Sequence, residues 1–322
     1  LGLGLANGIK GTGRGPFETG LVRVGRAGRI TAFTGALAMG QGLKTAFAQI
    51  VAEQLGVEPD EVTIVAGDTA TVSTGQGGFA SRQTVTAGSA LSLAAGKVRA
   101  KALALAAQLL EVPEDALELA EGRIRPRDGS NRSITLREAA EALAGVPGYA
   151  LPGGIEPGLE AEAHFMPAGL TYAYGAHAVE LEVDPETGMV ELTRYVVVND
   201  AGRLVNPTIV EGQLHGGVVH GIGNALFEHM VYDDQAQPVS TNFGEYLLPT
   251  ATEVPRMELS HIESASPMNP LGVKGVGETG VLPVAPAIVS AIEDALSEWG
   301  VEIDAYPVTP QRILELIAAA RG

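Results

Sequence analysis

The most informative part of the chain is a glycine-rich stretch, Asn269-Pro-Leu-Gly-Val-Lys-Gly-Val-Gly-Glu-Thr-Gly280, which places the carboxylate of Glu278 between glycines. Glycine adopts positive φ readily and lets a ligand approach the main chain closely. A glutamate in this setting is either a turn residue that faces water, which is common in glycine-rich loops, or an acid/base group held against something small. Three further glycine-rich clusters upstream favour the second interpretation: Met39-Gly-Gln-Gly42, Gly77-Gly-Phe-Ala-Ser-Arg-Gln83 and Glu211-Gly-Gln-Leu-His-Gly-Gly217.

Composition limits the class of protein. A chain of 322 residues is long enough for a large core and two subdomains. Its net charge of −17 argues against a nucleic-acid surface. We see no apolar run of the ~18–20 residues that a membrane span needs, and no basic signal-peptide region, so we expect a cytoplasmic protein. The absence of cysteine excludes disulfides, thiolate zinc sites and iron–sulfur clusters from this chain, and any redox relay must lie on other polypeptides.

Hydrophobic periodicity and turn residues predict interleaved strands and helices, and therefore an α+β (mixed α/β) class. The Pro/Gly-rich stretch Pro147–Pro157 is the best candidate boundary, which divides the chain into subdomains 1–150 and 151–322. We expect hairpins within 21–34, 117–124 and 176–198, a strand at 61–66, helices at 41–55, 85–110, 136–143, 210–230 and 283–299, and a last helix that begins at Pro310 with Thr309 as its cap.

Nucleotide-binding motifs do not account for the glycines. A phosphate-binding P-loop that begins at Gly35 requires lysine at position 41, where Gln41 stands. Gly2-Leu-Gly4 has no room for a preceding strand and lacks the third glycine of a dinucleotide fingerprint. An unrelated nucleotide-binding module is therefore disfavoured.

In their order and spacing, the four clusters resemble the molybdenum-binding subunit of the xanthine dehydrogenase/aldehyde oxidase/carbon monoxide dehydrogenase family of molybdenum hydroxylases. The resemblance runs from the Gly11–Glu18 segment to Pro307–Pro310 and matches the C-terminal portion of that family's large subunit. It implies two molybdopterin-binding subdomains, of which the second carries the Glu278 loop. Whether the chain is a natural split subunit or a fragment stays open.

The resemblance also implies a set of cofactor contacts. Met39–Gly42 lies between a strand and a helix, where main-chain N–H groups bind anions. Gln213 matches a glutamine that hydrogen-bonds the cofactor or one of its oxygen ligands, and Arg82 is a candidate anion contact. The full set is Gly40, Gln41, Gly42, Ala80, Ser81, Arg82, Gln83, Gln213 and Lys274.

Each assignment has a plainer alternative. Met39–Gly42 can be an ordinary first turn of a helix, and Ser81 can be simply an N-cap. Arg82 can form a surface salt bridge, Gln213 can be an exposed helical residue, and Lys274 a surface lysine.

Glu278 is, by the same resemblance, the catalytic base. The hydroxylation needs a group that takes a proton from the attacking oxygen, and a buried carboxylate suits that role. His215 and His220 are five residues apart, which is the wrong spacing for two ligands on one helical face, so we expect them to satisfy backbone groups in the core. The metal would be held by the pterin dithiolene rather than by this chain.

The activity implied is hydroxylation of an electron-poor carbon, in an N-heteroaromatic compound or an aldehyde, with oxygen from water. The implied cofactor is molybdenum–molybdopterin in its cytosine dinucleotide form. The implied partners are a second molybdopterin-binding chain, a small subunit with iron–sulfur clusters of the 2Fe–2S type, and an FAD subunit. The alternative is a non-catalytic structural chain that packs on a cofactor-bearing partner.

Overall fold

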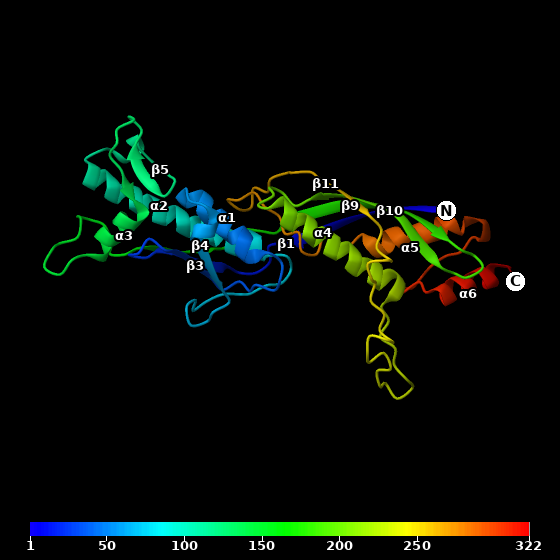
Figure 1. Cartoon of the computed structure of the whole chain (residues 1–322). Helices are drawn as coiled ribbons and strands as arrows, with labels where there is room; N and C mark the ends of the chain where they lie inside the picture. The colour runs from blue at the N-terminus through cyan, green and yellow to red at the C-terminus, as the bar shows by residue number, and fades with distance from the viewer. Residues whose placement is uncertain (322) are drawn as a thin grey trace. The chain divides into compact units, whose positions relative to one another are not determined.

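The computed structural model describes residues 1–321, which divide into two compact units (Figure 1). Unit 1 consists of Leu1–Gly11, Tyr172–Ser264 and the chain from Lys274 onward. Unit 2 consists of Thr12–Thr171 and Ala265–Val273. Both units combine sheet and helix, so the predicted mixed α/β class is confirmed.

The main sheet of unit 2 has the order β4-β3-β2-β8. Strands β2 (Glu18–Val24) and β3 (Ile30–Thr34) form the predicted hairpin, closed by the turn at Gly25–Gly28. Strand β4 (Val62–Ala66) pairs with β3 in parallel, and β8 (Leu159–Phe165) pairs with β2 antiparallel. The alternating buried side chains of β2 and β3 place one face of this sheet on the core.

Helices α1 (Leu43–Leu55) and α2 (Ser89–Leu110) belong to unit 2 as well. Helix α1 ends at Gly56, which adopts φ 60° as the predicted stop residue. Helix α2 lies against β2 at Gly20, where a Cβ would come within 2.7 Å of the Ala90 carbonyl carbon. Only glycine allows so close an approach between helix and strand.

A smaller sheet completes unit 2, with the order β5-β6-β7. It consists of β5 (Leu117–Ala120), β6 (Arg123–Pro126) and β7 (Ile134–Thr135). Helix α3 (Leu136–Ala144) follows directly, and the last residue of β7 caps it: its hydroxyl accepts a hydrogen bond from the Glu138 amide, while the Glu138 carboxylate accepts one from the amide of the cap.

The sheet of unit 1 has the order β1-β9-β10-β11. Strands β9 (Thr171–Val183) and β10 (Val190–Asp200) form an antiparallel hairpin around the predicted turn, and β11 (Met257–His261) pairs with β10 in parallel. Strand β1 (Gly2–Thr12) lies at the other edge, beside β9.

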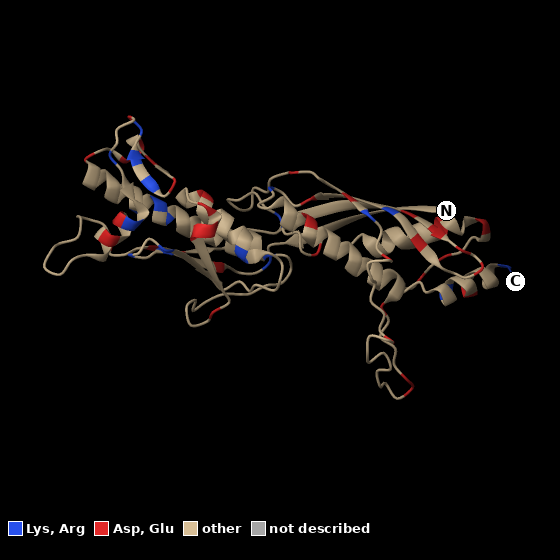
Figure 2. Cartoon of the chain, viewed as in Figure 1, with Lys and Arg blue, Asp and Glu red and all other residues tan. Residues whose placement is uncertain are grey.

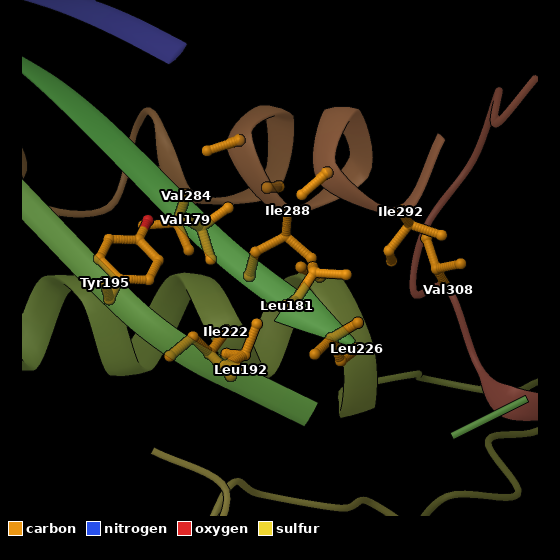
Figure 3. Packing of buried hydrophobic residues seen from close by; sticks show 14 of the residues in the cluster. Val179, Leu181, Leu192, Tyr195, Ile222, Leu226, Val284, Ile288, Ile292 and Val308 are labelled. Carbon is orange, nitrogen blue, oxygen red and sulfur yellow. The ribbon is translucent and has the colours of Figure 1, made fainter. Parts of the chain in front are cut away.

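Helices α4 (Pro207–Ile222) and α5 (Val284–Ala295) pack on one face of this sheet, and α6 (Pro310–Arg321) closes the chain. Asn206 caps α4 by accepting a hydrogen bond from the Ile209 amide, and Thr309 caps α6 as predicted. Figure 3 shows the apolar core between sheet and helices. Its labelled members are Val179, Leu181, Leu192, Tyr195, Ile222, Leu226, Val284, Ile288, Ile292 and Val308.

Charged residues are distributed over both units (Figure 2). Several arginines lie on the small sheet of unit 2, where the Glu118 carboxylate pairs with both Arg125 and Arg127. Their charge is thus partly balanced within the sheet. Among the described residues, no helix combines the length and the apolar character that crossing a membrane requires.

The predicted helices and hairpins are confirmed, with changes at their ends. A π-type turn, Thr84–Gly88, precedes α2, and another, Gly223–Phe227, follows α4 in place of regular helix. The compact units also change over at residue 171 rather than at the predicted division after residue 150, because β8 lies beyond that division and yet completes the sheet of unit 2.

Candidate functional site

The loop between β3 and α1 carries the first group of predicted cofactor residues. Gly40 and Gly42 adopt φ of 98° and 75°, which favour glycine, and Gly42 is the N-cap residue immediately before α1. The Gln41 amide folds back on this loop: its oxygen accepts a hydrogen bond from the Met39 amide at 2.7 Å, and its nitrogen donates to the Leu37 carbonyl at 2.9 Å. Gln41 therefore holds the loop in shape.

The loop before α2 lies beside the first one in unit 2. The Gln83 nitrogen donates to the same Leu37 carbonyl at 2.8 Å, and its amide oxygen accepts a hydrogen bond from the Gln41 nitrogen. Ala80 and Ser81 both have φ of 49°, which is uncommon for residues with a side chain. Backbone held in such a conformation is found at ligand sites more often than elsewhere.

Ser81 does not cap the helix, contrary to one of its two interpretations. Helical residues begin at Gln83, and Ser81 has left-handed φ, whereas an N-cap adopts an extended conformation. The observed conformation of Ser81 instead turns the main chain of the loop.

Arg82 has an internal role that sequence reasoning missed. Its side chain is fully buried and pairs with the equally buried Glu18 carboxylate at 2.6 Å. Its guanidinium nitrogens also donate to the main-chain carbonyls of Arg14, Phe17 and Gly77. The guanidinium thus has its partners inside unit 2. It forms neither the surface salt bridge nor an open anion contact.

Helix α4 presents glycines on its exposed side. A Cβ at Gly212 or Gly216 would meet no atom within 4 Å, although glycine inside a helix costs about 0.5–1 kcal/mol relative to alanine. Gly217 differs, because a Cβ there would lie 2.9 Å from the main chain of Gly280. Gln213 is half-buried on this helix. Helix α4 and the Glu278 loop are therefore in direct contact within unit 1.

Glu278 lies in the loop that leads to α5. The next residue, Thr279, is buried, and its hydroxyl donates to the Val276 carbonyl at 3.0 Å, which tightens the turn. The Glu278 side chain is 43% exposed within this chain, rather than buried as expected. Its Oε1 lies 3.3 Å from Nζ of Lys10, a residue that the sequence gave no reason to place there.

Lys274 lies in the same stretch and points elsewhere. Its ammonium donates to Asp200 Oδ1 at 3.0 Å and to the Ser264 hydroxyl at 2.8 Å, and it lies over the Tyr174 ring. Burial alone would raise the pKa of Asp200, but hydrogen bonds from Ser264, the Gly202 amide and Lys274 outweigh it and lower that pKa. Lys274 is only 8% exposed, so it is not a surface lysine.

The two histidines on α4 are exposed, so the expectation that they lie in the core is wrong. Nδ1 of His215 lies 2.8 Å from the Glu211 carbonyl one turn earlier. Elsewhere in unit 1, His177 is fully buried against the Tyr195 hydroxyl. Among the described residues, no group of three or more His, Asp or Glu side chains is arranged to hold a metal ion.

The predicted site residues thus form two groups. Gly40, Gln41, Gly42, Ala80, Ser81, Arg82 and Gln83 lie together in unit 2. Gln213, Lys274 and Glu278 lie in unit 1, where the loop contacts α4.

Comparison with known proteins assigns the family. Residues 1–255 match the molybdopterin cofactor-binding domain. The chain is 43% identical, over 97% of its length, to the gamma subunit of the 6-hydroxypseudooxynicotine dehydrogenase complex of Paenarthrobacter nicotinovorans, and 37% identical, over 87%, to the carbon monoxide dehydrogenase large chain of Afipia carboxidovorans. The match covers 39% and 34% of those two proteins.

Solved structures agree with this assignment. Quinoline 2-oxidoreductase from Pseudomonas putida 86 superposes with a TM-score of 0.91 at 34% identity, and the match covers 98% of this chain and 42% of that one. The chain therefore belongs to the molybdopterin cofactor-binding domain family of xanthine dehydrogenase- and carbon monoxide dehydrogenase-type large subunits. It corresponds to about 40% of such a subunit.

The residues present fit such a cofactor. Gly40 and Gly77 have positive φ, and a Cβ at either would meet no atom within 4 Å. The same holds for Gly212 and Gly216 on α4. Positive φ accounts for Gly40 and Gly77, but neither backbone conformation nor internal packing calls for glycine at positions 212 and 216 of α4, where the open main chain suits the close approach of a large group.

Proposed function

We propose that this chain supplies part of the cofactor site and the catalytic base of a molybdenum hydroxylase. The observation that carries this proposal is the position of Glu278. It lies on a tight loop against the glycine-bearing helix α4, with its carboxylate partly accessible and next to a cation. A general base must be able to reach the proton that it takes, and a carboxylate fixed at the accessible edge of a rigid loop satisfies that requirement.

The roles of the other residues follow from their contacts. When bound, the molybdenum–molybdopterin group supplies the electron-accepting centre and activates the oxygen that is transferred. Gly40 and Gly42 leave main-chain groups of the first loop open to the pterin, and Gln41 with Gln83 fixes the two loops against each other. The buried ion pair between Arg82 and Glu18 anchors the loop before α2, so that Ala80 and Ser81 keep their left-handed conformation.

Gln213 and Lys274 have different parts in the proposal. Gln213, half-buried on α4, would hydrogen-bond the cofactor, as the family resemblance implies. Lys274 acts from within by holding the chain before Glu278 to the end of β10 through Asp200. Glu278 takes the proton from the attacking oxygen and releases it to solvent.

The substrate class that we favour is an N-heteroaromatic compound. Among the relatives are a nicotine 6-hydroxylase large subunit, at 35% identity, and quinoline 2-oxidoreductase, and nicotine and quinoline are both N-heteroaromatic. Carbon monoxide dehydrogenases are also among the relatives, so carbon monoxide is the main competing substrate.

The complete enzyme would need further components. We propose the cytosine dinucleotide form of the cofactor, a second molybdopterin-binding portion, an iron–sulfur subunit and an FAD subunit. The gamma-subunit relative belongs to a complex by its own name, and the two electrons of each turnover must leave through groups that a chain without cysteine does not ligate.

Metal analysis combined with isotope labelling tests the proposal. The purified complex should contain about one molybdenum per copy of this chain and release a pterin cytosine dinucleotide on denaturation. Turnover of a pyridine or quinoline in H2¹⁸O should place ¹⁸O in the product. A complex that turns over without molybdenum, or a product without label from water, would refute the proposal and leave the chain with a structural role.

A further inference from the structure

Strand β1 turns its large apolar side chains away from the helices of its own unit. On the inner face, a Cβ at Gly2 would lie 1.9 Å from the Ala291 carbonyl oxygen of α5, and one at Gly4 would lie 2.0 Å from that of Ala287. Only glycine fits between strand and helix at such distances. Because successive side chains of a strand point to opposite faces, the residues between these glycines lie on the outer face of the sheet.

The outer face is apolar and exposed at this edge of the sheet. Its apolar side chains on β1 are 64–74% exposed, and the neighbouring strand β9 adds two tyrosines that are 56% and 39% exposed. The hydroxyls of Thr12 and Thr171 lie 2.6 Å apart, which brings the end of β1 next to the beginning of β9. We call the following set the outer patch: Leu1, Leu3, Leu5, Ile9, Tyr172 and Tyr174.

The apolar surface continues across the sheet and ends at charged residues. On β9 and β10, Ala178 lies opposite Val196, and both are half-buried. Two residues further along β9, Glu180 lies opposite Arg194, which forms a two-point ion pair with Glu258 at 2.7 and 3.1 Å. An apolar centre with a charged rim is the usual composition of a stable protein–protein interface.

The outer patch is larger than the apolar surface that a protein normally leaves open to water. Single exposed leucines are common, but contiguous apolar patches of several hundred Å² mark places where another surface binds. A long edge strand with apolar side chains also promotes aggregation when nothing covers it. We therefore expect the outer patch to be covered in the assembled protein.

A second copy of this chain is a poor match for the outer patch. Each copy carries a net charge of −17, so two copies repel each other. Pairing of two β1 edges would also require free main-chain groups, whereas the Leu3 amide already donates to the Asp294 carboxylate of α5 at 2.9 Å.

The partner that fits is the rest of the large subunit. In the relatives, the portion that corresponds to this chain belongs to a longer polypeptide, of which the match covers 39% in the gamma subunit and 42% in quinoline 2-oxidoreductase. More than half of each of those proteins therefore has no counterpart here. A portion that is always present in equal amount can cover an apolar surface permanently, and permanent interfaces are the most apolar ones.

We propose that the outer patch is the docking surface for the second molybdopterin-binding portion of the large subunit, which covers it with a layer of apolar side chains. The proposal rests on the proposed function, which supplies this partner. Layers that pack on a sheet face lie about 10 Å from it. The partner therefore contacts the side chains of the outer patch rather than the main chain of β1.

Photo-cross-linking in the purified complex identifies the partner. The photo-reactive residue p-benzoylphenylalanine takes the place of Leu5 or, as a control for non-specific reaction, that of Leu109, an exposed residue of α2 in unit 2. The position of Leu5 should cross-link to the remaining large-subunit portion, on a separate chain or on the same polypeptide, in higher yield than the control. Cross-links to a second copy, to an iron–sulfur or FAD subunit, or in no higher yield than the control would overturn the proposal.

A matched pair of charge variants measures what the patch contributes to assembly. Leu5 and Leu109 are 67% and 49% exposed within this chain, so Leu5→Glu and Leu109→Glu should each change the thermal unfolding midpoint of the separate chain by no more than about 2 °C. Leu5→Glu should nevertheless reduce recovery of the complex, after co-expression with the remaining portion, by at least about tenfold, because a carboxylate in an apolar interface has no partner.

The control Leu109→Glu should leave the recovery of the complex unchanged. Leu3→Glu, on the same face of β1, is a second variant that should behave like Leu5→Glu, and it replaces Leu5→Glu if that variant fails to fold. Normal assembly of a folded variant with glutamate in the outer patch would contradict the proposal.

The proposed function and the docking surface fail in different ways. If Leu5 cross-links to the remaining portion in a complex that lacks molybdenum, the docking surface stands and the proposed function falls. If a molybdenum-loaded complex is active while Leu5 cross-links to a second copy or to another subunit, the proposed function stands and the docking surface is refuted.

Discussion

Lys274 Nζ lies 3.0 Å from Asp200 Oδ1, and the two side chains are 8% and 0% exposed. The pair joins the stretch that leads to Glu278 to the end of strand β10, and the Lys274 amide adds a hydrogen bond to the Ala201 carbonyl. Lys274, predicted as a cofactor contact, is therefore committed to the interior of unit 1. Its contribution to the site is the position of the loop.

Breaking this pair on one side should destabilise unit 1. Lys274→Met leaves the Asp200 carboxylate buried without its cation, which typically costs about 3–5 kcal/mol. Urea unfolding of the purified protein measures the change. The double variant Lys274→Met/Asp200→Asn should recover much of the loss, because no charge is then left unpaired. A single variant within about 1 kcal/mol of wild type would contradict this account.

His177 should make stability depend on pH. Burial lowers its pKa from 6.5 to about 4, so the folded protein keeps it neutral where the unfolded chain binds a proton. The effect of His177 on the free energy of unfolding is absent above pH 6.5. As the pH falls from 6.5 toward 4, the unfolded chain binds the proton first, and the free energy of unfolding decreases by up to about 3 kcal/mol. His177→Gln should flatten the dependence of unfolding free energy on pH between 5 and 6.5, whereas replacing the exposed His215 by Gln should not. An unchanged slope in His177→Gln would rule His177 out as its cause.

The Glu18–Arg82 pair should hold the loop before α2. Glu18→Gln leaves the buried guanidinium without its carboxylate and weakens the hydrogen bonds that Glu18 accepts from the Gln76 amide, at a cost of about 3–5 kcal/mol. We expect faster proteolysis within residues 73–76, which are exposed. The matched control is Glu160→Gln, which removes an exposed pair with Arg23 and should change stability by less than about 1 kcal/mol. Equal effects of the two substitutions would contradict the proposed anchor.

Two neighbouring glycines of α4 should respond in opposite ways to alanine. Gly217→Ala forces the Gly280 main chain away and should destabilise the protein, whereas Gly216→Ala meets open space and should stabilise the cofactor-free protein by about 0.5–1 kcal/mol. Thermal unfolding of the two variants, measured side by side without cofactor, compares them. Stabilisation by Gly217→Ala would show that α4 and the Glu278 loop do not meet as described.

Local signals in the sequence predicted most of the fold. The hairpin turn at Asp184–Gly188, the stop at Gly56 and the cap at Thr309 each depend on residues within a few positions of one another. Strand β1 was missed because its buried face is formed by glycines, whereas its alternating apolar residues Leu3 and Leu5 are exposed. These glycines allow β1 to contact α5, which follows nearly three hundred residues later in the chain. No local pattern in the sequence predicts a contact over that separation.

The same distinction applies to the site. The loops that bear Gly40, Ser81 and Glu278 could be identified from the sequence by their glycine content. The ion-pair partners of the charged residues could not be identified in this way, since Lys10 and Glu278 are 268 positions apart and Glu18 and Arg82 are 64 apart. Such pairs depend on strand register and helix packing, which arise only in the folded chain.

In the proposed function, Glu278 is the base that takes the proton from the attacking oxygen. Glu278→Gln keeps the size of the side chain but cannot accept the proton, so turnover should fall by about 10²–10⁴-fold. Glu278→Asp should be nearly as damaging, because a displacement of ~1 Å can cost about 10²-fold. The most direct test measures turnover and molybdenum content on the same preparation of Glu278→Gln. The account predicts full molybdenum content with turnover reduced by at least about 10²-fold, and full molybdenum content with undiminished turnover would contradict it.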